Sequence, residues 1–116
     1  MSEPLDEDAP ALAAVAADAT TLLEASTDDG VGHPGLEGLG DAEDVVTQLS
    51  RLAEELQRTM THLGDYLDES SSGRDHPRPG LGAARQALGD VRVVAAEMAQ
   101  LLRVAEQALL EARTAR

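Results

Sequence analysis

The sequence contains no cysteine, lysine, isoleucine, asparagine, phenylalanine or tryptophan, and Tyr66 is its only aromatic residue. Without cysteine the chain forms no disulfide, offers no thiolate to a metal and has no thiol nucleophile. The codons of Lys, Ile, Asn and Phe are AT-rich, so their joint absence indicates a GC-rich coding sequence. A core without large aromatic side chains must come from Leu, Val, Ala and Met, which predicts a thin core between closely spaced helices.

Positive charge is also scarce. The 116 residues include nine basic side chains, all Arg, against 22 Asp and Glu, which gives a formal net charge of -13. Residues 1–50 hold twelve of these acids and no Arg, whereas residues 76–116 hold four acids and six Arg. Scattered Arg in an acidic chain argue against a nucleic-acid surface, which needs a basic stripe. The acidic first half either steers basic partners or is only a solvated surface, as in a salt-adapted proteome.

Long apolar runs are missing as well. The apolar stretch at residues 9–17 is short and follows acidic residues, whereas a secretory signal peptide has a basic start. No stretch approaches the roughly 20 apolar residues that a membrane span needs. We therefore expect a soluble cytoplasmic protein without a membrane partner.

A long apolar stripe is present in the last third of the chain, with spacings that alternate between three and four residues. Its members are Leu81, Ala84, Leu88, Val91, Ala95, Met98, Leu102, Ala105, Leu109 and Ala112. This spacing keeps the side chains on one side of an α-helix, so it predicts a helix at residues 81–114. Such a helix needs a partner helix to cover its stripe.

A second stripe of the same kind precedes it. Its members are Ala42, Val45, Leu49, Leu52, Leu56, Leu63 and Tyr66, with Thr59 at an apolar position. It predicts a helix at residues 41–69 with Asp41 as its N-cap. Residues 70–79 contain three Ser, one Gly and two Pro and are typical of a hairpin loop.

The pairing of the two helices leads to a prediction about charge. If the hairpin turns near residue 75, Arg85 comes close to Asp65 and Asp68. Arg103 then comes close to Glu43 and Asp44. Both pairs are expected to be surface ion pairs of at most about 1 kcal/mol.

Four segments are predicted. Residues 1–10 form a disordered acidic tail that ends at Pro10, and residues 11–25 form a short amphipathic helix. Residues 26–40, with five Gly and Pro34, form a flexible linker without regular structure. Residues 41–116 form the helical hairpin. The expected fold is all-α: a long, coiled-coil-like antiparallel hairpin with a short N-terminal helix across it, as a three-helix bundle or part of a four-helix dimer.

The apolar surface of both long helices is wider than a two-stranded coil covers. Beside the stripes lie Val46, Ala53, Met60 and Leu67 in the first helix, and Ala87, Val94, Leu101 and Ala108 in the second. Further apolar residues occur on the outer side of the second helix. The candidate interaction face comprises Val93, Val94, Leu101, Val104 and Leu110. We expect this face to bind a protein partner or to mediate self-association.

Two motifs could suggest chemistry but lack its structural context. Residues 30–35 read G-x-G-x-x-G, which binds dinucleotide phosphates only between a strand and a helix. Here a predicted helix precedes the motif, Asp28 and Asp29 adjoin it and no strand is predicted, so we expect no dinucleotide to bind.

His62 and Asp65 have the i, i+3 spacing of two metal ligands, but no third ligand accompanies them. The Glu-x-x-His pairs of di-iron bundles are absent. We therefore expect no catalytic, metal or cofactor site, no small-molecule ligand and no enzymatic activity.

In outline the predicted hairpin resembles the small helical-hairpin substrates and chaperones of type VII secretion in actinobacteria. These proteins carry Trp-x-Gly in the interhelical turn and a Tyr-x-x-x-Asp or Tyr-x-x-x-Glu export signal after the second helix. Here there is no Trp, residues 62–64 read His-Leu-Gly within a predicted helix, and Ser70 follows Tyr66 by four residues. The primary functional hypothesis is thus a small adaptor, scaffold or regulator, and a type VII secretion-associated hairpin is the alternative.

Overall fold

The structure is a computed structural model that describes residues 8–71 and 78–115. This part of the chain forms three α-helices, α1 (Ala9–Thr27), α2 (Leu39–Ser71) and α3 (Leu81–Thr114), and the short 3-10 helix η2 (Asp29–Val31). No strand occurs among these residues, which confirms the all-α prediction. The chain divides into a first unit that ends at Gly38 and a second that begins at Leu39, and each is described by itself.

Helix α1 is longer than predicted by two residues at each end. Pro10 lies in its first turn, where a missing backbone N–H costs no helical hydrogen bond. The amide of Leu12 donates to the carbonyl of Asp8 at 3.0 Å and closes that turn. Of the predicted acidic tail, residues 1–7 lie outside the described residues.

The glycine-rich segment after α1 contains a hydrogen-bonded turn, so the expectation that it lacks regular structure is wrong for this part. The Asp28 carboxylate accepts from the Gly30 amide at 2.9 Å, and residues 29–31 form η2. The Gly35 amide donates to the Ser26 carbonyl at 2.8 Å. The side chain of Asp28 and the backbone of Ser26 thus supply hydrogen bonds that glycine content alone does not reveal.

The same turn explains the G-x-G-x-x-G spacing without a ligand. Gly32 has φ of 78°, in the left-handed region that glycine adopts at no steric cost. A Cβ atom on Gly35 would lie 2.9 Å from the Cβ of Ser26, which is too close for two carbon atoms. Two of the three glycines are therefore required by the turn itself.

This geometry predicts different effects for two substitutions. Gly35→Ala should lower the free energy needed to open the turn by more than about 1 kcal/mol, because Ala cannot occupy the position without displacing Ser26. The exchange rate of the residue-35 amide with solvent, measured by NMR, should rise by about fivefold or more. Gly38→Ala is the control, because no atom lies within 4 Å of a Cβ built there. Equal effects of the two variants would contradict the close contact.

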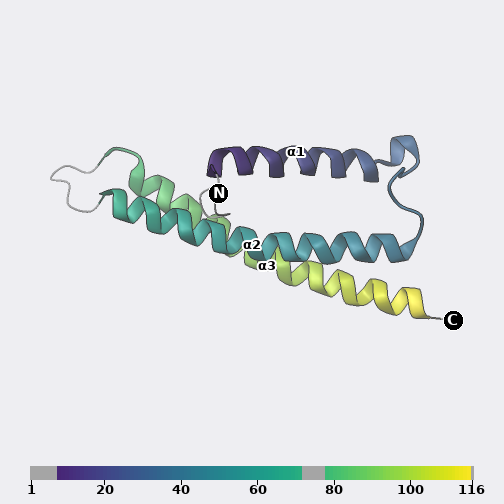
Figure 1. The fold of residues 1–116 in the computed structure, drawn as a ribbon. Helices are drawn as coiled ribbons and strands as arrows, with labels where there is room; N and C mark the ends of the chain where they lie inside the picture. The colour runs from purple at the N-terminus through teal and green to yellow at the C-terminus, as the bar shows by residue number, and fades with distance from the viewer. Residues whose placement is uncertain (1–7, 72–77, 116) are drawn as a thin grey trace, which may run out of the picture. The chain divides into compact units, whose positions relative to one another are not determined.

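Helices α2 and α3 form the predicted antiparallel hairpin and pack side by side along their lengths (Figure 1). Helix α3 begins at Leu81 and ends at Thr114, as predicted. Helix α2 begins at Leu39, two residues before the predicted start, so Asp41 lies in its first turn rather than at the N-cap. Most of the predicted hairpin loop, residues 72–77, lies outside the described residues.

Small side chains occupy the centre of the α2–α3 seam. The buried residues in the described part of the chain are Ser50 and Ala53 of α2 and Ala95 and Ala99 of α3. The Ser50 hydroxyl reaches the backbone carbonyl of Ala99 at 3.5 Å, a long hydrogen bond. A serine side chain can contact the backbone of the facing helix only where the two helices approach closely. The thin core expected from the composition is therefore present.

The seam follows the predicted stripes only in part, and this is a correction. Six of the ten α3 stripe residues are buried or half-buried: Leu81, Leu88, Ala95, Leu102, Ala105 and Leu109. Ala42, Val45, Leu49 and Leu56 of the α2 stripe are half-buried as well. The other members prove more exposed: Val91 and Met98 of α3, and Leu52, Leu63 and Tyr66 of α2. The seam is instead centred on the small residues beside these stripes, because only small side chains allow the backbones to come so close.

Enlarging a seam residue should therefore destabilise the hairpin. Ala53 is fully buried, so Ala53→Leu should cost about 1–3 kcal/mol through overpacking. Ala83→Leu is the matched control, because Ala83 is exposed and the change should stay within about 0.5 kcal/mol. The measurement is urea denaturation followed by circular dichroism. If Ala53→Leu unfolds at the same urea midpoint as the wild type, the helices are not closely packed at this position.

Candidate interaction surface

The α2–α3 hairpin has two chemically different sides. Successive residues of an α-helix point about 100° apart, so the two neighbours of a seam residue lie on opposite sides of the seam. Leu52 and Glu54 flank the buried Ala53 in this way. On α3, Leu101 and Arg103 flank the half-buried Leu102. Because Glu54 and Arg103 form an ion pair, Leu52 and Leu101 share the other side.

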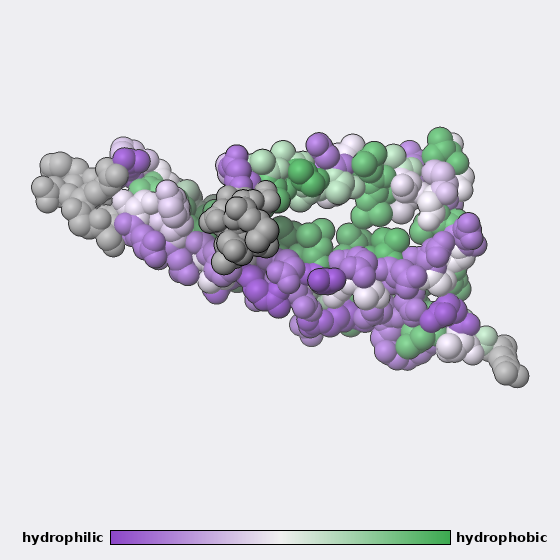
Figure 2. Space-filling view, viewed as in Figure 1, coloured by the Kyte–Doolittle hydropathy of each residue, from purple (hydrophilic) through white to green (hydrophobic). Residues whose placement is uncertain are grey.

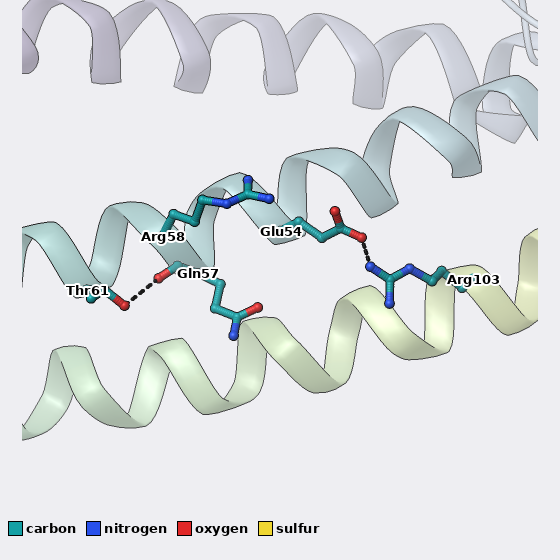
Figure 3. Close-up of a pocket in the computed structure, with 5 residues that line it drawn as sticks. All are labelled: Glu54, Gln57, Arg58, Thr61 and Arg103. Atoms are coloured by element: carbon teal, nitrogen blue, oxygen red, sulfur yellow. Dashed lines mark hydrogen bonds and ion pairs between the residues drawn. The ribbon is translucent and has the colours of Figure 1, made fainter.

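A row of contacts connects the helices on the first side, which we call the polar face. The four contacts pair Glu43 with Arg113, Thr47 with Glu106, Glu54 with Arg103, and Asp68 with Arg85. Their α2 members are spaced by 4, 7 and 14 residues and so fall on one helical stripe. Figure 3 shows the Glu54–Arg103 contact. These contacts fix the register of the two helices.

The register prediction is confirmed at one end of the hairpin and wrong at the other. Arg85 pairs with Asp68, as expected. Arg103 pairs with Glu54 and not with Glu43 or Asp44. Glu43 pairs instead with Arg113, at 2.8 Å. The Glu54–Arg103 and Glu43–Arg113 pairs therefore place Arg103 farther along α2, towards the hairpin loop, than the predicted register did.

A hollow of about 300 Å³ on the polar face is lined by Glu54, Gln57, Arg58, Thr61 and Arg103 (Figure 3). Both of its guanidinium groups have carboxylate partners, Glu55 for Arg58 at 2.7 Å and Glu54 for Arg103. The Thr61 hydroxyl donates to the Gln57 carbonyl at 3.1 Å. Both guanidinium groups and the Thr61 hydroxyl of the hollow therefore already have protein partners.

The second side, which we call the apolar face, carries large aliphatic side chains from both helices. It comprises Val45, Leu49, Leu52, Leu56, Leu63 and Tyr66 of α2 and Val91, Val94, Met98, Leu101 and Ala105 of α3. Leu101, the most exposed member, has 69% of its surface accessible. In Figure 2 apolar side chains gather along one edge of α2, while polar side chains cover the side of the hairpin turned to the viewer.

The predicted interaction residues are all exposed, but they do not form one surface. Val94 and Leu101 lie on the apolar face. Val93 lines a hollow with Gln57 and Arg92 towards the polar face. Leu110 follows the polar-face residue Glu106 by one turn. The fifth residue, Val104, lies in a row at the outer border of α3, together with Asp90, Glu97 and Glu111 at seven-residue spacing.

Sequence reasoning missed the contribution of α2 to this surface. Heptad spacing predicts Leu52 and Leu63 in the seam, but both are exposed. The sequence does contain a feature that predicts this. Ser50 and Ala53 are small enough to lie between two closely packed helices, which leaves larger neighbouring side chains exposed beside the seam.

Other candidate sites bring no ligand set together. His62 and Asp65 are both exposed on α2. Residues 8–71 and 78–115 contain no group of three or more His, Asp or Glu placed to hold a metal ion. Within the same part of the chain, no helix combines the length and apolar character needed to cross a bilayer.

Comparison of the chain with protein-family models, curated proteins and solved structures gives no match. The functional argument therefore rests on the surfaces of the hairpin.

The polar-face register can be tested by exchanging charges. Glu54→Arg and Arg103→Glu should each destabilise the protein by up to about 1 kcal/mol, because each places like charges together on a partly exposed surface. The double variant restores opposite charges and should recover most of the loss. Urea denaturation in low salt measures all four proteins. Additive losses in the double variant would show that the two side chains do not face each other.

Proposed function

We propose that this chain is a protein-protein interaction module, acting as an adaptor, scaffold or regulator, whose binding surface is the apolar face of the α2–α3 hairpin. The observation that carries the proposal is the division of side chains at the seam. Ala and Ser fill the seam, while Leu52, Val94 and Leu101 remain exposed on one continuous side. Contiguous exposed apolar surface with a polar rim is typical of a protein-binding site.

The energetic argument concerns what the hairpin leaves unburied. Removing a Leu or Val side chain from water contributes about 1.5–3 kcal/mol, and the apolar face holds several such side chains. The seam buries mainly alanines, which contribute much less because each offers a single methyl group. A partner helix on the apolar face would therefore add to the binding energy and to the stability of the hairpin together.

The partner contact should be specific to one side of α3. Leu101 and Gln100 are adjacent and both exposed, but Leu101 lies on the apolar face and Gln100 points towards the polar face. A photo-crosslinking amino acid at position 101 should capture a protein in the native cell, whereas one at position 100 should not. Adding Leu52→Gln should reduce capture from position 101 by about fivefold or more.

Mass spectrometry of the captured adducts identifies the partner and its contact segment. Circular dichroism of each variant verifies that the helices remain intact. Equal capture from positions 100 and 101, or no capture from either, would contradict the proposal.

A type VII secretion-associated hairpin remains the alternative proposal. The antiparallel hairpin is the feature in its favour. Gly64 lies inside α2, however, so the position of a Trp-x-Gly turn is not reproduced. Tyr66 and Ser70 also belong to α2 and do not follow the second helix of the hairpin.

A further inference from the structure

The charged side chains that border the apolar face indicate which charges a binding partner should carry. Outside the apolar stripe of each helix, the next row of side chains repeats every seven residues. On α2 this row reads Asp41, Gln48, Glu55, His62 and Glu69; on α3 it reads Asp90, Glu97, Val104 and Glu111. Every charged side chain in these two acidic rows is a carboxylate, and neither row contains an Arg.

Most arginines of α2 and α3 lie elsewhere. Arg85, Arg103 and Arg113 form ion pairs on the polar face. Arg92 lines a polar-side hollow with Gln57, and Glu97 of the α3 row lines the same hollow. Arg51 and Arg58 occupy the row next to the acidic row of α2. Arg58 pairs with Glu55 at 2.7 Å and neutralises one member of the α2 row, which leaves the α3 row as the stronger acidic border.

From this arrangement we infer that the apolar face binds an amphipathic helix of another protein whose apolar stripe is bordered by Arg or Lys. The inference rests on the proposed function and names the chemistry of the partner. Opposite charges at the rim of an interface speed association and fix the orientation of the partner. The apolar anchors would follow the i, i+3, i+4, i+7 spacing of a helix lying along the apolar face.

A second copy of this chain fits the face poorly. Two apolar faces packed on each other would bring the acidic rows of one copy against those of the other, and like charges at a rim oppose binding. Residues 1–50 hold twelve acids and no Arg, so the first half of another copy cannot supply basic borders either. The formal net charge of -13 adds a general repulsion between copies.

The length of the face sets the length of the probe. From Val45 to Tyr66 the apolar face extends over about 32 Å at 1.5 Å per residue. A helix of about 21 residues matches this length. The probe is a fluorescein-labelled peptide of that size with Leu and Ala in its stripe and Arg along both borders.

Two control peptides separate the apolar and electrostatic contributions. One has Glu in place of every Arg, and the other has the same composition in scrambled order, without an apolar stripe. Fluorescence anisotropy with the full chain should give at least tenfold tighter binding for the basic-bordered peptide than for either control. Its affinity should also fall as salt rises, because the rim charges are solvent-exposed.

Adjacent valines of similar exposure provide the matched protein variants. Val94, 61% exposed, lies on the apolar face, whereas Val93, 54% exposed, points to the polar side. Val94→Gln should weaken peptide binding by about fivefold and Val93→Gln by less than twofold. Glu111→Gln, in the α3 acidic row, should weaken it by about threefold, whereas Glu106→Gln, the same charge change on the polar face, should have little effect.

Each result supports or overturns the inference. Equal binding of the basic, acidic and scrambled peptides would overturn it. So would a wild-type dimer in light scattering that Val94→Gln dissociates and the basic peptide does not displace, because a second copy would then cover the face. Capture of a protein from position 101 without preference for the basic peptide would overturn the inference and leave the proposed function intact. Absence of both capture and peptide binding would overturn both.

Discussion

The close approach of α2 and α3 through Ala53, Ala95 and Ala99 is the constraint on which the rest of the hairpin depends. At the centre of the seam, methyl groups and one serine hydroxyl leave no room for a fully buried Leu or Met between the backbones. The larger aliphatic side chains must therefore lie beside the seam. They gather on one side because the other side is taken by the row of contacts from Glu43 to Asp68.

The polar and apolar faces have complementary roles. On the polar face, carboxylates and guanidinium groups pair across the helices and set the register, although each exposed pair adds little stability. This pairing holds three arginines, Arg85, Arg103 and Arg113, on the polar face. The rims of the apolar face are consequently acidic, so the same arrangement that holds the hairpin together gives its exposed side a charge preference.

In the first unit, the geometry of a turn explains two glycines of a short motif. Its G-x-G-x-x-G spacing accompanies a turn in which Gly32 adopts a left-handed conformation and Gly35 packs against Ser26. The glycines serve the backbone path after α1, and no phosphate is needed to explain them. The candidate binding surface of the chain therefore lies on the hairpin.

Periodicity in the sequence determined the all-α fold, the bounds of α3, the hairpin and the Arg85–Asp68 pair, because apolar spacing and loop composition are local properties. Only the tertiary structure decided which of two adjacent stripes on each helix forms the seam. Both stripes satisfy the helical period, and the choice depends on how closely two backbones can approach. That distance left Leu52 and Met98 exposed and created an apolar face drawn from both helices, and the tertiary structure also paired Arg103 with Glu54. The sequence supplied the side chains, but the close packing of small residues determined which of them remain available to a partner.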